Sequence, residues 1–230
     1  MHQLLKIVPS AKFVAFLDAD VKFSNPHWVK ETVHALHHYH VVQLFSQAIN
    51  LNSKFEQMWN CNSRFFCFAN KGFSQKPEKE LKYIANGHPG LAWAFTIDAL
   101  NNLGGLLDFA VTGSGDTHMA NALMGDVIFN AKKGMSAGFE RALKRWAEKC
   151  NKHIKQNIGY VNGICFHYWH GKSEERGYDK RWDITCFHGY DPSEDIYIAA
   201  NQLYTFTGNK PQLEYDLRLS TSARNEDDLK

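Results

Sequence analysis

The feature that most constrains this sequence is a run of five apolar residues, Phe13–Leu17, with the triplet Asp18-Ala19-Asp20 directly after it. Such a run predicts a β-strand that is buried on both faces, as in the middle of a parallel sheet. The two carboxylates would then lie beyond the carboxyl end of the strand, where open α/β sheets bind ligands. Paired carboxylates there suit a divalent cation that bridges to phosphates, although a strand end followed by a turn explains an isolated D-x-D equally well.

Composition and charge narrow the class of protein further. With 44% hydrophobic residues among 230, the chain can form the core of one domain of ordinary size. The net charge of +2 favours neither nucleic acid nor a membrane surface as a partner. No apolar stretch is long enough to span a membrane, and the first residues do not form a signal peptide pattern. The 5 widely spaced cysteines favour free, buried thiols and a cytoplasmic location.

Helix signals predict the element that follows the triplet. Asn25 as N-cap and Pro26 at the first helical position begin a helix that runs to about His38. His34 and His38 lie one turn apart on this helix, but a solvated helix face is a better interpretation than a metal cluster. Residues 41–48 are expected to form one continuous strand.

The later elements follow from the same kinds of pattern. The sequence predicts an aromatic-rich helix over 54–70, a polar loop over 71–79, a helix over 97–103, a short strand over 127–129, a helix over 136–151 and a strand within 161–171 that opens into a loop. From about Phe187 the periodicity is lost. We therefore expect a main domain over residues 1–186 and an irregular C-terminal extension over residues 187–230.

Two glycine-rich stretches and a histidine motif hold the other candidate site residues. Gly90 would let the backbone approach a ligand closely, and Trp93 offers a flat apolar face for a sugar ring or a base. Asp116 begins a helix after a glycine-rich turn, and His167 and His170 end the strand near residue 167. These three groups are the candidates for ligand binding and catalysis.

Each candidate also has a purely structural interpretation. Trp93 is equally well explained as a core residue. A carboxylate such as Asp116, in the first turn of a helix, is stabilised by the helix dipole without any catalytic role. His170 could simply pack against Trp169.

In this order and spacing, the motifs resemble those of GT-A-fold glycosyltransferases that use nucleotide sugars. The motifs are Asp18-Ala19-Asp20, the stretch from Gly90-Leu91-Ala92-Trp93-Ala94 to Gly113-Ser114-Gly115-Asp116, and His167-Tyr168-Trp169-His170-Gly171. The similarity is to the β-1,4-galactosyltransferase and polypeptide N-acetylgalactosaminyltransferase groups, and the tail looks like that of phage or viral glycosyltransferases. The resemblance covers roughly residues 1–185 and implies an α/β fold, with a GT-A-like, Rossmann-type mixed sheet flanked by helices.

The resemblance also implies a metal site. Asp20 would ligate Mn2+, or Mg2+, while Asp18 would face the ribose and the metal-bound water. His170 would complete the site from the far end of the domain, with His167 as the second choice. Imidazole and carboxylate ligands suit such an ion, and a nucleotide diphosphate would fill its other positions.

The remaining roles concern the donor and the acceptor. Asp116 matches the residue that takes the proton of the acceptor hydroxyl in inverting members. Gly90 and Trp93 would line the donor-sugar and acceptor pocket. Arg176, and with less support Lys172, would neutralise the departing diphosphate. The implied reaction moves a hexosyl group from a nucleotide sugar, usually UDP-linked, to a hydroxyl of a glycan or protein, with the stereochemical outcome left open.

The chain departs from the family at its N-terminus. Few residues precede Asp18, so the N-terminal nucleotide-binding strands of a GT-A domain are expected to be lacking. The strand over 13–17 would then have an exposed apolar edge, and a partner chain could supply the missing half.

Two other functions stay open. The first is a catalytically inactive remnant of the same fold that binds a carbohydrate or a partner. The second is a metal-dependent hydrolase of phosphoesters, which commonly needs a denser ligand set for two metal ions.

Overall fold

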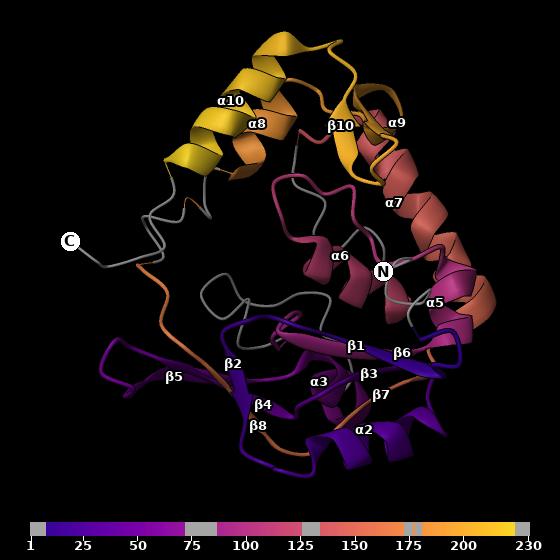
Figure 1. Ribbon diagram of the computed structural model, residues 1–230, viewed down its shortest axis with the longest axis vertical. Helices are drawn as coiled ribbons and strands as arrows, with labels where there is room; N and C mark the ends of the chain where they lie inside the picture. The colour runs from indigo at the N-terminus through magenta and orange to yellow at the C-terminus, as the bar shows by residue number, and fades with distance from the viewer. Residues whose placement is uncertain (1–7, 72–86, 126–133, 173–176, 178–180, 224–230) are drawn as a thin grey trace.

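The computed structural model describes residues 8–71, 87–125, 134–172, 177 and 181–223. Within these residues the chain is mixed α/β, with two four-stranded mixed sheets, one two-stranded sheet and flanking helices. Figure 1 shows the two larger sheets gathered at one end of the molecule, with most of the helices stacked beyond them. The expected α/β class with a mixed sheet flanked by helices is therefore confirmed.

The first sheet has the strand order β1-β6-β3-β7. Its strands are β1 (Phe13–Leu17), β6 (Ala92–Thr96), β3 (Val41–Gln43) and β7 (Ile158–Tyr160). β6 is antiparallel to both β1 and β3, whereas β3 and β7 are parallel. Among the described residues β1 pairs only with β6, and none of its five residues is fully buried. The prediction of a central, parallel strand at 13–17 is therefore wrong for the described residues, in which β1 is an edge strand paired antiparallel with β6.

The second sheet has the strand order β2-β8-β4-β5. Its strands are β2 (Val21–Phe23), β8 (Ile164–His167), β4 (Gln47–Leu51) and β5 (Gln57–Asn62). The strand predicted over 41–48 is thus two strands, because the chain leaves the first sheet after Gln43 and enters the second at Gln47. The buried side chains of Leu44 and Phe45 fill this crossing, so the apolar run continues although the strand does not.

The helix predicted over 54–70 is wrong in its first half. Asn52 Oδ1 accepts hydrogen bonds from the backbone N–H groups of Lys54 and Glu56, both at 2.9 Å, and this turn leads into β5. β5 pairs antiparallel with β4 across the hairpin. Only the second half is helical, as α3 (Arg64–Lys71), because pairing with β4 overrides the local helix pattern.

Several predicted helices are confirmed. They are α2 (Trp28–Leu36), α5 (Ile97–Leu103), α6 (Gly115–Leu123) and α7 (Ala137–Lys149), the last continuing as a π-helical turn, η1 (Cys150–Ile154). Thr96 and Ser136 cap α5 and α7 with their hydroxyl oxygens. α2 begins two residues later than predicted, since Asn25 accepts from the N–H of His27 in a turn before the helix. The strand expected at 127–129 and all but the first residue of the 71–79 loop lie outside the described residues.

The C-terminal part is regular, so the prediction of an irregular extension after residue 187 is wrong for the described residues. Its elements are α8 (Arg181–Phe187), α9 (Pro192–Asp195), β9 (Ile196–Ile198), β10 (Tyr204–Phe206) and α10 (Pro211–Ser222). Pro192 and Pro211 occupy the first turns of their helices, where a missing N–H costs nothing. Tyr190, Leu213 and Leu217 are buried in the same core as α5, α6 and α7.

The strands of the first sheet are packed on both faces. Trp93 and Phe95 of β6 face the helices α5, α6 and α7, while Ala92 and Ala94 face the side covered by α2. All five cysteines, each in the described part, are free, and four are buried, which confirms the predicted free thiols. No helix within the described residues is both long and apolar enough to cross a membrane.

Candidate metal centre

The pairing of β2 with β8 brings the Asp18-Ala19-Asp20 triplet close to the histidine motif at residues 167–171. Asp20 directly precedes β2, and Val21 of β2 pairs with His167 at the end of β8. The Tyr168 N–H donates to the carbonyl oxygen of Asp20 at 2.8 Å, which extends the pairing by one step. Asp20 and His167, distant in the sequence, therefore lie side by side.

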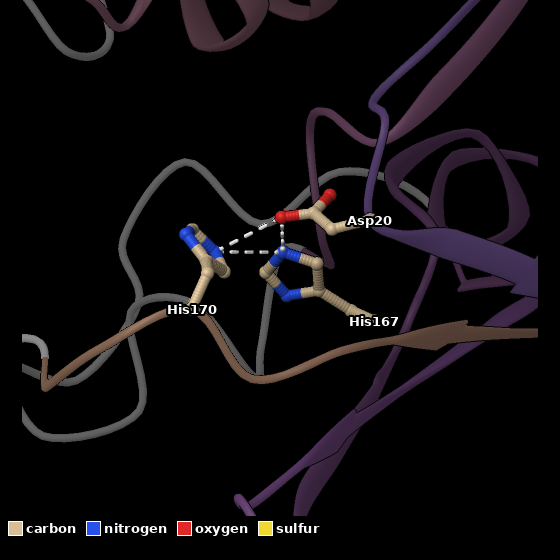
Figure 2. A group of neighbouring side chains, drawn as sticks. All are labelled: Asp20, His167 and His170. Carbon is tan, nitrogen blue, oxygen red and sulfur yellow. Dashed lines mark hydrogen bonds and ion pairs between the residues drawn. The ribbon is translucent and has the colours of Figure 1, made fainter. Parts of the chain in front are cut away.

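Asp20, His167 and His170 form a compact group of potential metal ligands (Figure 2). Asp20 Oδ2 lies 3.3 Å from His167 Nε2 and 3.2 Å from His170 Nε2, and the two imidazole nitrogens are 3.1 Å apart. Ligand atoms about 2.1 Å from one cation, at octahedral or tetrahedral angles, lie about 3.0–3.4 Å from each other. The three spacings therefore match those of a preformed ligand set.

Asn50 orients the imidazole of His167. Asn50 of β4 pairs in register with His167 of β8, and its Oδ1 lies 2.6 Å from His167 Nδ1. A hydrogen bond at Nδ1 leaves the Nε2 lone pair toward Asp20, as in metal sites where a second partner fixes the histidine tautomer. Asn50 is not among the residues predicted from the sequence, because only the strand register reveals its position.

The carboxylates of this region have opposite pKa shifts. The hydrogen bond with His167 is the main cause that lowers the pKa of Asp20. Partial desolvation of the Asp18 carboxyl group raises its pKa, and the nearby charges of Asp20 and Asp116 raise it further. Asp18 is not among the three grouped ligands, and its predicted place facing the ribose and the metal-bound water stays a prediction. Three neighbouring carboxylates nevertheless make this a site where a cation would relieve repulsion.

The carboxylate of Asp116 lies against the backbone of Gly90, a second candidate site residue. A Cβ atom added to Gly90 would lie 2.6 Å from Asp116 Oδ2, so this carboxylate occupies the space that a side chain at position 90 would need. Asp116 stands in the first turn of α6, and its Oδ1 accepts from the Thr117 N–H at 2.7 Å. Its charge is close enough to raise the pKa of Asp18. The structure thus brings Asp116, Gly90 and Asp18 together.

His88 holds the segment that carries Gly90. Its Nδ1 accepts a hydrogen bond from the Gly90 N–H at 3.1 Å, and its ring stacks on Trp59. Desolvation, together with the charges of His167 and Arg64, lowers the pKa of His88 to about 3, so the ring is neutral near pH 7. His88 is not among the residues predicted from the sequence, although its place in Gly87-His88-Pro89-Gly90 was a usable signal.

The side chain of Gln43 also holds the segment from His88 to Gly90 in place. Its buried Nε2 donates to the carbonyl oxygens of His88 and Pro89 at 3.0 and 3.1 Å, and its Oε1 accepts from the Phe65 N–H at 2.8 Å. A buried amide with these three partners fixes the segment to the first sheet.

The remaining candidates from the sequence are Trp93, Lys172 and Arg176. Trp93 is only 5% exposed and packs between Phe65 and Phe95, so it is a core residue and its predicted role in lining the pocket is wrong. It faces the helices because side chains alternate along β6. Lys172 is exposed, two residues after His170. Arg176 lies outside the described residues.

Comparison with known proteins gives no identification: no family model matches the chain, and no curated protein and no solved structure matches it significantly. What the site can do therefore follows from its own residues and their geometry.

Proposed function

We propose that this chain is a metal-dependent glycosyltransferase with a GT-A-like fold. In this proposal Asp20, His167 and His170 hold Mn2+ or Mg2+, and the donor is a nucleotide sugar, UDP-linked, whose hexosyl group passes to a hydroxyl of a glycan or protein. The observation that carries the proposal is the preformed three-ligand group beside a second pair of carboxylates, Asp18 and Asp116. Bound there, the cation would neutralise the charge of the leaving diphosphate.

Asp116 is the proposed general base. Its carboxylate lies in the first turn of α6, and its place against Gly90 keeps it fixed. It would take the proton of the acceptor hydroxyl while that oxygen bonds to the anomeric carbon and the bond from this carbon to the diphosphate oxygen breaks. Product stereochemistry at the anomeric carbon would distinguish this inverting reaction from a retaining one.

The same ligand types support a second candidate. Two imidazoles and one carboxylate with open positions also suit Fe(II) in enzymes that activate oxygen. The two additional carboxylates favour the transferase, because a nucleotide donor needs a divalent cation beside a base, whereas oxygen activation needs neither Asp18 nor Asp116.

The first test is calorimetric titration with Mn2+, Mg2+ and Fe(II), each with and without UDP. We expect Mn2+ to bind, UDP to bind only when Mn2+ is present, and both to be lost in Asp20→Ala and His170→Ala. Asp98→Ala, which removes an exposed carboxylate from the first turn of α5, is the matched control and should bind like the natural sequence.

Three results would contradict the proposal. Equal Mn2+ affinity in Asp20→Ala would exclude the metal site, and Mn2+ binding without UDP binding would exclude nucleotide-sugar chemistry in this chain. Tight binding of Fe(II) with no effect of UDP would favour the oxygen-activating candidate.

A further inference from the structure

An exposed tryptophan lies beside the candidate metal centre and has no role in the function proposed above. Trp59 of β5 is 40% exposed, although tryptophan is usually well buried. Its ring stacks on His88, with 6.4 Å between the centroids and 17° between the planes. An exposed aromatic ring held flat in one orientation is a preformed surface for another flat apolar group.

Strand register places Trp59 in the same row of residues as His167, one of the proposed metal ligands. Trp59 of β5 pairs with Asn50 of β4, and Asn50 pairs with His167 of β8. Residues that pair across neighbouring strands share one face of the sheet. Trp59 therefore lies on the face of His167, about 10 Å away at two strand spacings.

A second series of contacts connects Trp59 with the proposed base. The Trp59 ring stacks on His88, whose Nδ1 accepts from the Gly90 N–H, and Gly90 lies against Asp116 Oδ2. Because His88 is neutral near pH 7, the stack is between two uncharged rings. Strand register therefore links Trp59 to His167, and two intervening residues, His88 and Gly90, link it to the carboxylate that would receive the acceptor proton.

We propose that Trp59 is the platform on which the acceptor lies, and that the acceptor is a pyranose sugar. This inference rests on the proposed function and names the acceptor class for the same site. A pyranose has a flat face of C–H groups that packs on an indole ring, while its hydroxyls stay at the rim. With the ring stacked on His88 beforehand, little side-chain freedom is lost when a sugar binds.

The test measures glycoside binding separately from metal and nucleotide binding. Methyl β-glucoside, methyl β-galactoside and methyl β-N-acetylglucosaminide are titrated into the full chain with Mn2+ and UDP, and binding is followed by saturation-transfer NMR. At least one glycoside is expected to bind. Trp59→Ala should weaken it roughly tenfold or more, whereas Mn2+ and UDP affinities should stay within about twofold.

Three further variants make the result specific. Trp59→Phe keeps a flat ring and should retain most of the affinity, while Trp59→Leu keeps apolar packing over His88 without a flat ring and should lose it. Asn60→Ala is the matched control, because Asn60 is exposed on the same strand but pairs with Ile49, next to the Asn50–Trp59 pair, and therefore points to the opposite face. Circular dichroism establishes that each variant is folded, and Trp59→Leu replaces Trp59→Ala if the latter is not.

The possible failures are distinguishable. Binding of Mn2+ and UDP without any glycoside, or equal losses in Trp59→Ala and Asn60→Ala, would overturn the platform and leave the transferase intact. A loss of UDP rather than glycoside affinity in Trp59→Ala would overturn it in favour of a nucleobase platform. Glycoside binding that depends on Trp59 but occurs without Mn2+ or UDP binding would support the platform and contradict the transferase.

Discussion

The two four-stranded sheets of the described chain are joined by three stretches of sequence that cross from one to the other, yet they differ in what they bury. The chain passes from the first sheet to the second between β1 and β2, β3 and β4, and β7 and β8. The inner strands of the first sheet, β3 and β6, are almost wholly buried between two layers of apolar side chains. The second sheet carries Asn50 and His167 on one face and exposes most of β5.

Because of this difference, the residues that stabilise the fold and the candidate metal ligands lie in different parts of the structure. Buried apolar area is the main stabilising contribution, and it is concentrated around the first sheet. The ligand group lies where the chain leaves that sheet, at the crossing from β1 to β2, so its polar side chains are held by a rigid neighbour without being buried in it. Substitutions in the two sheets should therefore affect different measurements.

The largest effect on stability is expected from Phe95→Ala in β6. Phe95 is fully buried between the helices and the sheet, and its removal leaves a large cavity. The free energy of unfolding should fall by about 3–5 kcal/mol, measured by urea denaturation. Phe187→Ala, on a side chain that is 85% exposed, should change it by less than about 0.5 kcal/mol. A small effect of Phe95→Ala would contradict the conclusion that the stabilising apolar burial is concentrated around the first sheet.

Asn50→Ala should instead act on the metal. Without the Asn50 contact at Nδ1, the His167 ring loses its fixed tautomer and orientation, and Mn2+ affinity should fall roughly 10–100-fold. Isothermal titration measures this change. Asn60→Ala, on an exposed asparagine of the neighbouring strand, is the control. If both variants bind Mn2+ equally well, the second sheet does not hold the ligand group in the way proposed here.

Gly90→Ala tests the contact between the segment that precedes β6 and the first turn of α6. The added methyl group would collide with Asp116 Oδ2, so the free energy of unfolding should fall by about 1–3 kcal/mol. In the double variant with Asp116→Ala the collision is absent, and most of this loss should be recovered. Thermal or urea unfolding of the four proteins in this cycle gives the coupling energy, and simple additivity would show that Gly90 and Asp116 do not interact.

The last expected effect is a pH dependence from His88. Its pKa is about 3 in the folded chain and near 6.5 when unfolded, so between these values the unfolded state binds the extra proton. This contribution to stability is complete above about pH 6.5 and declines as the pH falls toward 3, by at most about 1.4 kcal/mol per pH unit. Metal-free urea unfolding between pH 4 and 7 should show a shallower slope in His88→Gln than in the exposed control His27→Gln. Equal slopes would mean that His88 is not desolvated as described.

Local sequence signals predicted the elements whose causes are local. Thr96 and Ser136 cap their helices as their positions suggest, and the apolar spacing of α5 and α7 reflects their packing on the core. The Asp18-Ala19-Asp20 triplet after an apolar strand and the histidine motif at the end of β8 were also selected from the sequence, because the resemblance to a known family implies one metal site for both. The two histidines remained alternatives until the structure placed both beside Asp20.

Long-range pairing decided what these signals could not. Residues 13–17 form a strand as predicted, but their place at an edge depends on which strands lie beside them. Residues 57–62 are a strand because β4 is available to pair with them, and Trp93 belongs to the core because β6 turns that face toward the helices.

The sequence by itself therefore determined the mixed α/β class, the capped helices and the residue types of the candidate metal centre. Only the tertiary structure decided which histidines meet Asp20, which asparagine orients them and which tryptophan stays exposed. The physical reason is that capping and apolar spacing act within a few residues. Strand register and burial, in contrast, depend on partners more than a hundred residues away along the chain, such as Asn50 and His167.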